Sequence, residues 1–268
     1  MRTSNKIALI VLSCDAYSDL WPIFINQFEI NWRDCPYDKY ISTNHLNSGS
    51  NSFQDLKIGE DKSWSDGVRK ALTQLKDKYE YALITLEDSV LVEKVDNNKF
   101  NEILTEFVKL NGNYLKFIKK PSPTNRFNSY FGEIKPGSLY RPTCVYALWK
   151  IETLLSLLDE NENAWEFERF GSIRSDKYPG FYVVYEDFFK ILNTIVKGKW
   201  VPSELKRLRR IGIHPQLERQ ILSNMSAFNL KFKTLIFKIF TTIIPWQYRR
   251  KIVLKIKHHD GKYHNSNI

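Results

Sequence analysis

Cysteine and histidine are scarce in this chain, and their placement argues against two kinds of site. The 268 residues include three cysteines and five histidines. The cysteines, Cys14, Cys35 and Cys144, have neither the paired spacing of a zinc site nor the density of a disulfide-stapled domain. The histidines are not clustered for metal binding, and the pair at 258–259 stands in a basic tail. Isolated thiols of this kind fit a reducing cytoplasm.

Glycine-rich phosphate loops and long apolar runs are missing as well. No Walker or dinucleotide-binding glycine pattern occurs, which argues against kinases and dehydrogenases. No stretch of about 18 uninterrupted apolar residues exists, so no membrane span is predicted. The apolar run at residues 7–12 is too short for a signal-peptide core, and no small-residue cleavage site follows it. We therefore interpret this run as a first β-strand.

Charge is plentiful and unevenly placed. Residues 197–268 carry a net charge of +13, whereas the rest of the chain carries −3. The first two-thirds is thus a near-neutral body, and the last third is a basic appendage. Such asymmetry indicates an anionic partner, which can be a membrane surface, a phosphate or a nucleic acid.

Strand and helix patterns alternate through the first 120 residues and predict an α/β fold. The expected strands there are residues 6–13, 38–43, 81–86 and 113–119, and the expected helices are 20–32, 63–79 and 96–110. This alternation predicts a mostly parallel sheet covered by helices on both faces. Further along, we expect strands at 139–146, 181–185 and 191–196, and helices at 147–158 and 202–211. Polar, turn-rich loops are expected at 44–62 and 121–136, the second of which is the kind that covers an acceptor site.

Two adjacent carboxylates end the strand expected at 81–86. Ligands of open α/β sheets bind at the carboxyl ends of the strands. Glu87 and Asp88 at such a place suit a divalent cation, Mn²⁺ or Mg²⁺, that bridges a diphosphate, or direct hydrogen bonds to a ribose. The alternative is two solvated acids that open a turn, and the pair alone does not decide between these readings.

Several short blocks in order carry a resemblance to a known family. They are Tyr17-Ser18-Asp19-Leu20-Trp21-Pro22, Trp32-Arg33-Asp34-Cys35-Pro36, Trp64-Ser65-Asp66, Leu86-Glu87-Asp88, Tyr140-Arg141-Pro142-Thr143, Ala147-Leu148-Trp149-Lys150, Glu162-Asn163-Ala164-Trp165-Glu166-Phe167-Glu168 with Gly171-Ser172, and Gly198-Lys199-Trp200. Over roughly residues 7–212 the chain resembles bacterial glycosyltransferases of surface-polysaccharide loci, those of lipopolysaccharide or capsule, with a GT-A-like fold.

This resemblance implies transfer of a sugar from a nucleotide-sugar donor to a growing glycan. It places Leu86-Glu87-Asp88 where GT-A enzymes usually hold an Asp-any-Asp metal motif. Here the two acids are adjacent, and alternation along a strand would point them to opposite faces. We therefore expect only one of them to reach the metal or the ribose.

A general base is expected in the block Trp165-Glu166-Phe167-Glu168. Its aromatic setting can raise the pKa of a carboxylate. On a strand the spacing of two puts Glu166 and Glu168 on one face, whereas on a helix they diverge. In inverting GT-A enzymes the base lies in a comparable block, so the resemblance favours one of these two, with a lean to Glu168. The alternative is a pair of acids that complement a helix dipole.

The other candidate donor contacts are single residues, each with a plain alternative. Tyr17 is expected to stack on the nucleobase, and Asp15 to accept a hydrogen bond from it. Asp66 is equally a first-turn helix acid, and Arg69 either faces phosphate or solvent. Arg141 is a candidate to hold a phosphate or an anionic acceptor.

Basic residues after the last predicted strand can neutralise a leaving diphosphate in place of a metal. The candidates are Lys199, Arg207 and Arg210. The alternative is a solvated helix face or a lipid contact.

We divide the chain into a catalytic domain, residues 1–222, and a basic helical extension, residues 223–268. Residues 224–257 combine a helical apolar face with lysines, arginines and the aromatics Trp246 and Tyr248, which is typical of a helix in a membrane interface. The alternative is a C-terminal helix packed on the body. The expected enzyme is cytoplasmic, peripheral on the inner membrane face, and acts on a glycan or lipid-linked acceptor, with no nucleic acid as partner. A non-enzymatic nucleic-acid-binding protein is the competing function.

Overall fold

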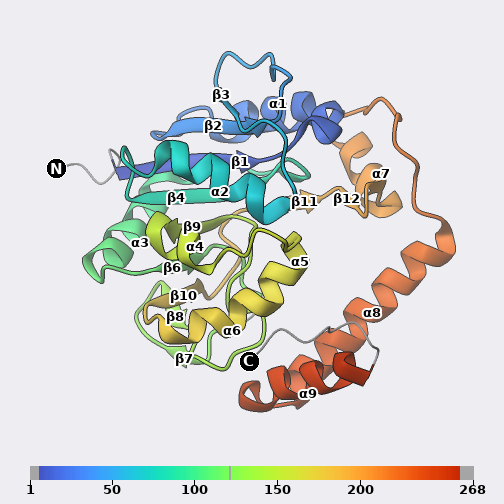
Figure 1. Ribbon diagram of the computed structural model, residues 1–268. Coiled ribbons are helices and arrows are strands. Elements are labelled where there is room, and N and C mark those ends of the chain that lie inside the picture. Colours follow the sequence, from blue (N-terminus) through green and yellow to red (C-terminus); the bar gives the residue numbers. More distant parts are fainter. Residues whose placement is uncertain (1–5, 121, 260–268) are drawn as a thin grey trace.

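A nine-stranded sheet forms the centre of the molecule (Figure 1). The computed structural model describes residues 6–120 and 122–259. Across the sheet the strands are β3 (Gln54–Lys57), β2 (Asp38–Thr43), β1 (Ile7–Leu12), β4 (Tyr81–Leu86), β9 (Ala147–Lys150), β6 (Tyr114–Lys116), β10 (Phe181–Val184), β8 (Phe131–Glu133) and β7 (Asn125–Arg126).

Most strands of this sheet run in one direction. The neighbours β3, β2, β1 and β4 are mutually parallel, and β6 is parallel to β10. Only β9 and β8 run the other way, because β9 is antiparallel to β4 and β6, and β8 is antiparallel to β10 and β7. This confirms the predicted α/β fold with a mostly parallel sheet flanked by helices.

Helices cover both faces of the sheet, and strand β1 shows why. Its six residues are all buried, and they alternate between two hydrophobic clusters. Ile7, Leu9 and Val11 pack with α1 (Trp21–Trp32) and α3 (Asn97–Lys109). Ala8, Ile10 and Leu12 pack with α2 (Trp64–Leu75) and α4 (Ile151–Leu157). A strand buried on both faces reads as a continuous apolar run, as this one does.

The strand expected at 139–146 is wrong, and so is the start of the helix after it. Tyr140 and Tyr146 have φ angles of 51° and 44°, in the left-handed region, which an extended strand does not allow. The strand forms later, as β9. The helix α4 therefore begins at Ile151 and not at residue 147.

Residues 191–196, expected as one strand, form two. β11 (Ile191–Asn193) pairs with β5 (Ser89–Leu91), and β12 (Ile195–Val196) pairs with β13 (Lys199–Trp200). Lys197 and Gly198 both have positive φ and make the tight turn between β12 and β13. The polar segment 44–62, expected as a loop, contains the edge strand β3.

The basic C-terminal segment is helical, as far as the structure describes it. After α7 (Pro202–Arg210), the chain enters α8 (Asn224–Ile243), which extends along one side of the body, and α9 (Trp246–His259) folds back beside it (Figure 1). Residues 260–268 of the predicted extension lie outside the described residues. Among the helices described, none combines the length and apolar character that crossing a bilayer requires.

Candidate functional site

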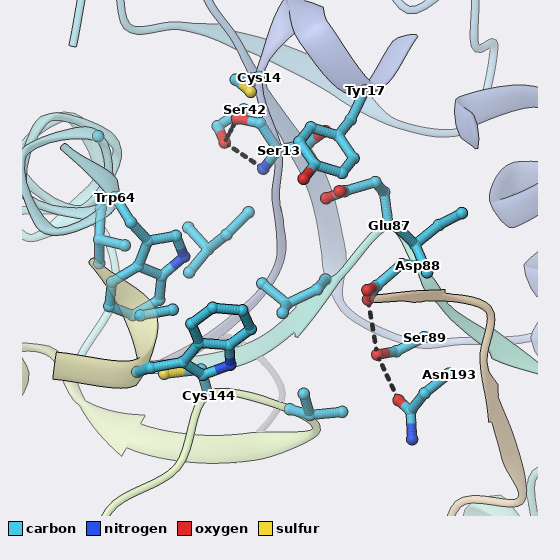
Figure 2. Close-up of a pocket in the computed structure, with 18 of the residues that line it drawn as sticks. Ser13, Cys14, Tyr17, Ser42, Trp64, Glu87, Asp88, Ser89, Cys144 and Asn193 are labelled. Atoms are coloured by element: carbon cyan, nitrogen blue, oxygen red, sulfur yellow. Dashed lines mark hydrogen bonds between the residues drawn. The ribbon is translucent and has the colours of Figure 1, made fainter. Parts of the chain in front are cut away.

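A cavity of about 520 Å³ lies where β1, β2 and β4 end (Figure 2). Ser13, Cys14 and Tyr17 follow β1, Ser42 lies near the end of β2, and Glu87 and Asp88 follow β4. The rest of the lining includes residues of other segments, namely Asp61, Trp64, Gly67, Val68, Cys144, Val145, Ala164, Trp165, Glu168, Asn193, Ile195, Val196 and Lys197. The carboxyl ends of parallel strands are where open α/β sheets bind ligands.

Both adjacent acids line this cavity, although alternation along a strand would point them to opposite faces. Strand β4 stops at Leu86, and Glu87 and Asp88 form the turn into β5, so the alternation of a strand does not apply to them. Figure 2 shows Glu87 beside the Tyr17 ring and Asp88 beside Ser89. The Ser89 hydroxyl lies 3.2 Å from Asp88 Oδ1 and 3.1 Å from Asn193 Oδ1, which fixes the Asp88 carboxyl against β11.

Burial dominates the electrostatics of this pair. Glu87 is 6% exposed, and its desolvation raises the pKa of the carboxyl; the Asp88 charge raises it further. Desolvation also raises the pKa of Asp88. Two neighbouring acids that resist ionisation gain a full negative charge most easily when a cation joins them.

The donor set fits a divalent cation held jointly with a ligand. No group of three or more His, Cys, Asp or Glu side chains within the described part of the chain is arranged to hold a metal by itself. Mg²⁺ and Mn²⁺ are commonly held by one or two carboxylates together with substrate phosphates. Glu87 and Asp88 are the residues that would take that part here.

Arg219 lies against Tyr17, a contact that no sequence pattern predicts. Its guanidinium carbon lies 4.3 Å from the centre of the Tyr17 ring. The same group donates to both carboxylate oxygens of Asp19, at 2.7 and 2.6 Å, and to the Ala16 carbonyl. The residues after Arg219 are hydrogen-bonded to Trp200 of β13, because the Trp200 amide donates to the Gln220 carbonyl and the Leu222 amide donates to the Trp200 carbonyl. This segment therefore fixes the aromatic ring that enters the cavity.

The block that carries the predicted base is helical. It comprises α5 (Ala164–Glu166) and a π-helical turn, Phe167–Gly171, so the strand alternative is wrong and the two glutamates diverge. Glu166 is not among the residues that line the cavity and accepts from the Asn163 amide at 3.0 Å as part of a capping box. Glu168 lines the cavity and accepts from the Cys144 amide at 3.3 Å.

A buried lysine lies near Glu168. Lys116 on β6 is 6% exposed and donates to the Lys120 carbonyl. Burial lowers the pKa of Lys116 to about 8. Burial raises the pKa of Glu168, and the Lys116 charge acts against that rise. Sequence reasoning missed this lysine, whose only signal is a charge at the end of the short strand Tyr114–Lys116.

Three predicted donor contacts are built into the scaffold instead. The Asp15 carboxylate accepts from the amides of residues 44, 45 and 46 and so shapes the loop after β2. Asp66 accepts from the Lys62 amide and pairs with Lys70, the helix-acid alternative. Arg69 donates to the Leu158 and Leu155 carbonyls. None of the three is among the residues that line the cavity.

The predicted basic contacts are also outside the cavity lining. Arg141 is fully buried, donates to the carbonyls of residues 134, 175 and 178, and lies 4.0 Å from the Phe181 ring centre. It therefore holds loops together and does not face an anion. Lys199 is exposed, and Arg207 pairs with Glu204 at 3.0 Å on the outside of α7, where Arg210 is exposed as well. Lys197, one turn earlier, is the lysine that reaches the cavity.

Comparison with known proteins gives a fold likeness only. No protein-family model matches the chain, and no curated protein matches it. Similar solved structures include TarS of S. aureus, TarS 1–349 of the same organism, and the mannosyltransferase PcManGT of Pyrobaculum calidifontis in complex with GDP-Man and Mn²⁺.

Each of these structures has a TM-score of 0.48 and 10% sequence identity to this chain. The matches cover 77%, 91% and 96% of this chain, and 38%, 77% and 76% of the respective neighbours, so the chain spans well under half of the longer TarS. Likeness at this level assigns no role to any residue, and the chemistry must come from the cavity itself.

Proposed function

We propose that this protein is a glycosyltransferase that takes a sugar from a nucleotide-sugar donor. One observation carries the proposal: a single cavity holds the buried Glu87 and the half-buried Asp88 at a strand end, and Glu168 and Trp165 on the facing wall. The acids suit the polar, phosphate-bearing half of a donor. The facing wall offers a carboxylate beside an indole, a combination that suits a sugar hydroxyl.

In this proposal three groups of residues bind different parts of the donor. The Tyr17 ring, held from behind by Arg219, stacks on the nucleobase. Glu87 and Asp88 bind the ribose or a divalent cation, Mn²⁺ or Mg²⁺, at the diphosphate. Such a cation, when bound, supplies charge stabilisation for the leaving diphosphate. Lys197 is placed to add positive charge at the same mouth.

Glu168 is the general base of the proposed reaction. A carboxylate that acts as a general base on an incoming hydroxyl needs a raised pKa and must still be able to ionise. Burial raises the pKa of Glu168, and the nearby charge of Lys116 favours its ionised form. A carboxylate that removes the acceptor proton as the hydroxyl attacks the sugar fits direct displacement, with inversion at the anomeric carbon.

The biological setting is a finer proposal. The sequence blocks that resemble surface-polysaccharide glycosyltransferases favour a role in lipopolysaccharide or capsule synthesis. The basic, apolar tail favours a lipid-linked acceptor and a peripheral position on the inner face of the cell membrane. The competing nucleic-acid-binding function is not favoured, because the tail's lysines border exposed aliphatic side chains that a phosphate backbone would leave in water.

Titration calorimetry with UDP, GDP, CMP and dTDP, each with and without Mn²⁺, tests the function. Saturable binding of one nucleotide, strengthened by Mn²⁺ and weakened at least about tenfold by Asp88→Ala, is the expected result. Arg207→Ala, on the outside of α7, serves as a control away from the cavity and is expected to bind like the unchanged protein. Failure of all four nucleotides to bind would contradict the proposal.

A further inference from the structure

Helix α8 presents a continuous apolar stripe to solvent. None of its residues is buried. Seven large apolar side chains are each between 49% and 69% exposed, and these are Met225, Phe228, Phe232, Leu235, Ile236, Ile239 and Ile243. At the rotation of an α-helix they fall within a face about 100° wide. A soluble surface rarely gathers apolar side chains in this way without a partner.

Positive charge borders this stripe on both sides. By helical rotation, Lys231 and Lys238 lie along one edge and Lys233 along the other. None of the three has an ion-pair partner among the residues that the structure describes. Residues 224–259 contain no Asp or Glu at all. The apolar stripe and the lysines that border it are together complementary to a surface with an apolar interior and anionic groups at its boundary with water.

This pattern discriminates between the surfaces that could cover the stripe. A second copy of α8 would bring lysines against lysines, with no acid in the segment to pair them. A nucleic acid would meet the lysines but leave the aliphatic side chains without a partner. A bilayer interface accommodates both the lysines and the aliphatic side chains. Trp246 and Tyr248, which are partly exposed in the first turn of α9, suit the depth of its headgroups.

We propose that the α8–α9 hairpin docks on an anionic lipid leaflet through this stripe. The opposite side of the hairpin is attached to the body. Phe237 contacts the Tyr140 ring with centres 5.9 Å apart, and Arg249 donates to the Ile244 and Thr241 carbonyls, which closes the hairpin. The stripe faces outward because these contacts occupy the inward side.

A second attachment links the hairpin to the cavity wall. Arg250 of α9 pairs with both carboxylate oxygens of Asp176, with one pair of atoms at 3.0 Å, and donates to the Ser172 carbonyl at 3.2 Å. Ser172 begins α6 (Ser172–Arg174) directly after the turn that carries Glu168, and Asp176 lies in the next turn, Ser175–Lys177. Docking would therefore orient the Glu168 wall relative to the bilayer.

Vesicle co-sedimentation with two matched double variants tests the docking. Phe232→Asp with Ile236→Asp places two acids in the stripe, whereas Ser226→Asp with Thr234→Asp places two acids on exposed positions off it. Both variants lose the same net charge, so general attraction to anionic lipid falls equally. Vesicles of phosphatidylcholine with phosphatidylglycerol are expected to bind the stripe variant at least about tenfold more weakly than the off-stripe variant.

Two results would overturn the proposal. Equal vesicle binding by the two variants would show that the stripe does not enter the lipid. The second result combines two observations: the wild type is a dimer in sedimentation velocity while the stripe variant is a monomer, and neither protein binds vesicles. The stripe would then be an interface between copies of the chain. Circular dichroism of both variants confirms that α8 is still helical. Docking needs no catalysis, so its failure leaves the sugar-transfer proposal standing.

Discussion

At the scale of single residues, Glu166 and Glu168 provide a direct comparison between a structural and a candidate catalytic carboxylate. They are two positions apart, yet one caps a helix and the other lines the cavity. Glu168→Gln is expected to lower sugar transfer at least about a hundredfold, because an amide cannot accept the acceptor's proton. Donor binding should stay within about twofold. Glu166→Gln keeps the capping oxygen and should keep the rate.

Release of the nucleotide from the sugar donor whose nucleotide binds in calorimetry measures both variants. Similar losses in the two glutamine variants would point to a folding defect, and no loss in either would remove Glu168 as the base. Circular dichroism separates the first outcome from a catalytic effect.

Which site residues could be foreseen depends on how local their signal is. Glu87 and Asp88 directly follow a strand, so periodicity placed them at the sheet edge, whereas Tyr17 lies five residues beyond the first strand and was singled out within the block Tyr17–Pro22. Arg219 acts on Asp19 across 200 positions, and no local pattern carries that pairing. Arg141 was misplaced for the converse reason: a charged residue that is fully buried looks in sequence like one that faces a ligand.

At the scale of elements, the strand–helix alternation was readable, and its exceptions have physical causes. Strands β1, β2 and β4 end within a residue of their expected limits because apolar runs there stop at polar turns. The error at 139–146 arose because two left-handed tyrosines break an otherwise strand-like composition. A backbone conformation imposed by tertiary packing leaves no mark in residue type when the residue is not glycine.

The segment that joins α7 to α8 should influence the cavity through Arg219. Arg219→Ala removes the guanidinium from behind Tyr17 and leaves Asp19 unpaired, so nucleotide affinity should fall about tenfold. Arg219→Lys should restore little of it, because a lysine cannot both stack and bind two oxygens.

Calorimetry with the nucleotide that binds the unchanged protein measures this effect. Arg209→Ala, exposed on α7, removes the same charge elsewhere and serves as the control. Full affinity in the Arg219→Ala protein would mean that the ring needs no support from this segment.

At the scale of the whole molecule, the exposed positive charge and the buried acids lie in different parts of the chain. The last 72 residues carry the excess positive charge, which favours approach to an anionic surface with the hairpin leading. The body instead holds its unusual charges inside, at the cavity. That arrangement makes the stability of the whole fold depend on the protonation of a few acids.

We expect Glu87→Gln to stabilise the protein at high pH. The folded state raises the pKa of Glu87 through burial and the Asp88 charge, so the native protein binds more protons than the unfolded chain. Wild-type stability should therefore fall as pH rises from about 5 to about 8, and the variant lacks this loss, for a gain of at least about 1 kcal/mol at the upper pH. Near the lower pH the two proteins should differ little, since Glu87 is then neutral in the native state.

Urea unfolding at both pH values, with a chelator present, measures the difference. Adding Mn²⁺ at the upper pH should reverse the order, because a bound cation stabilises the ionised pair in the wild type and the amide offers it a poorer ligand. A gap between the proteins that is the same at both pH values would mean that Glu87 ionises freely in the fold. The carboxyl pair would then be a solvated turn, the alternative that the sequence left open, and the cavity would lose the feature that makes it a diphosphate site.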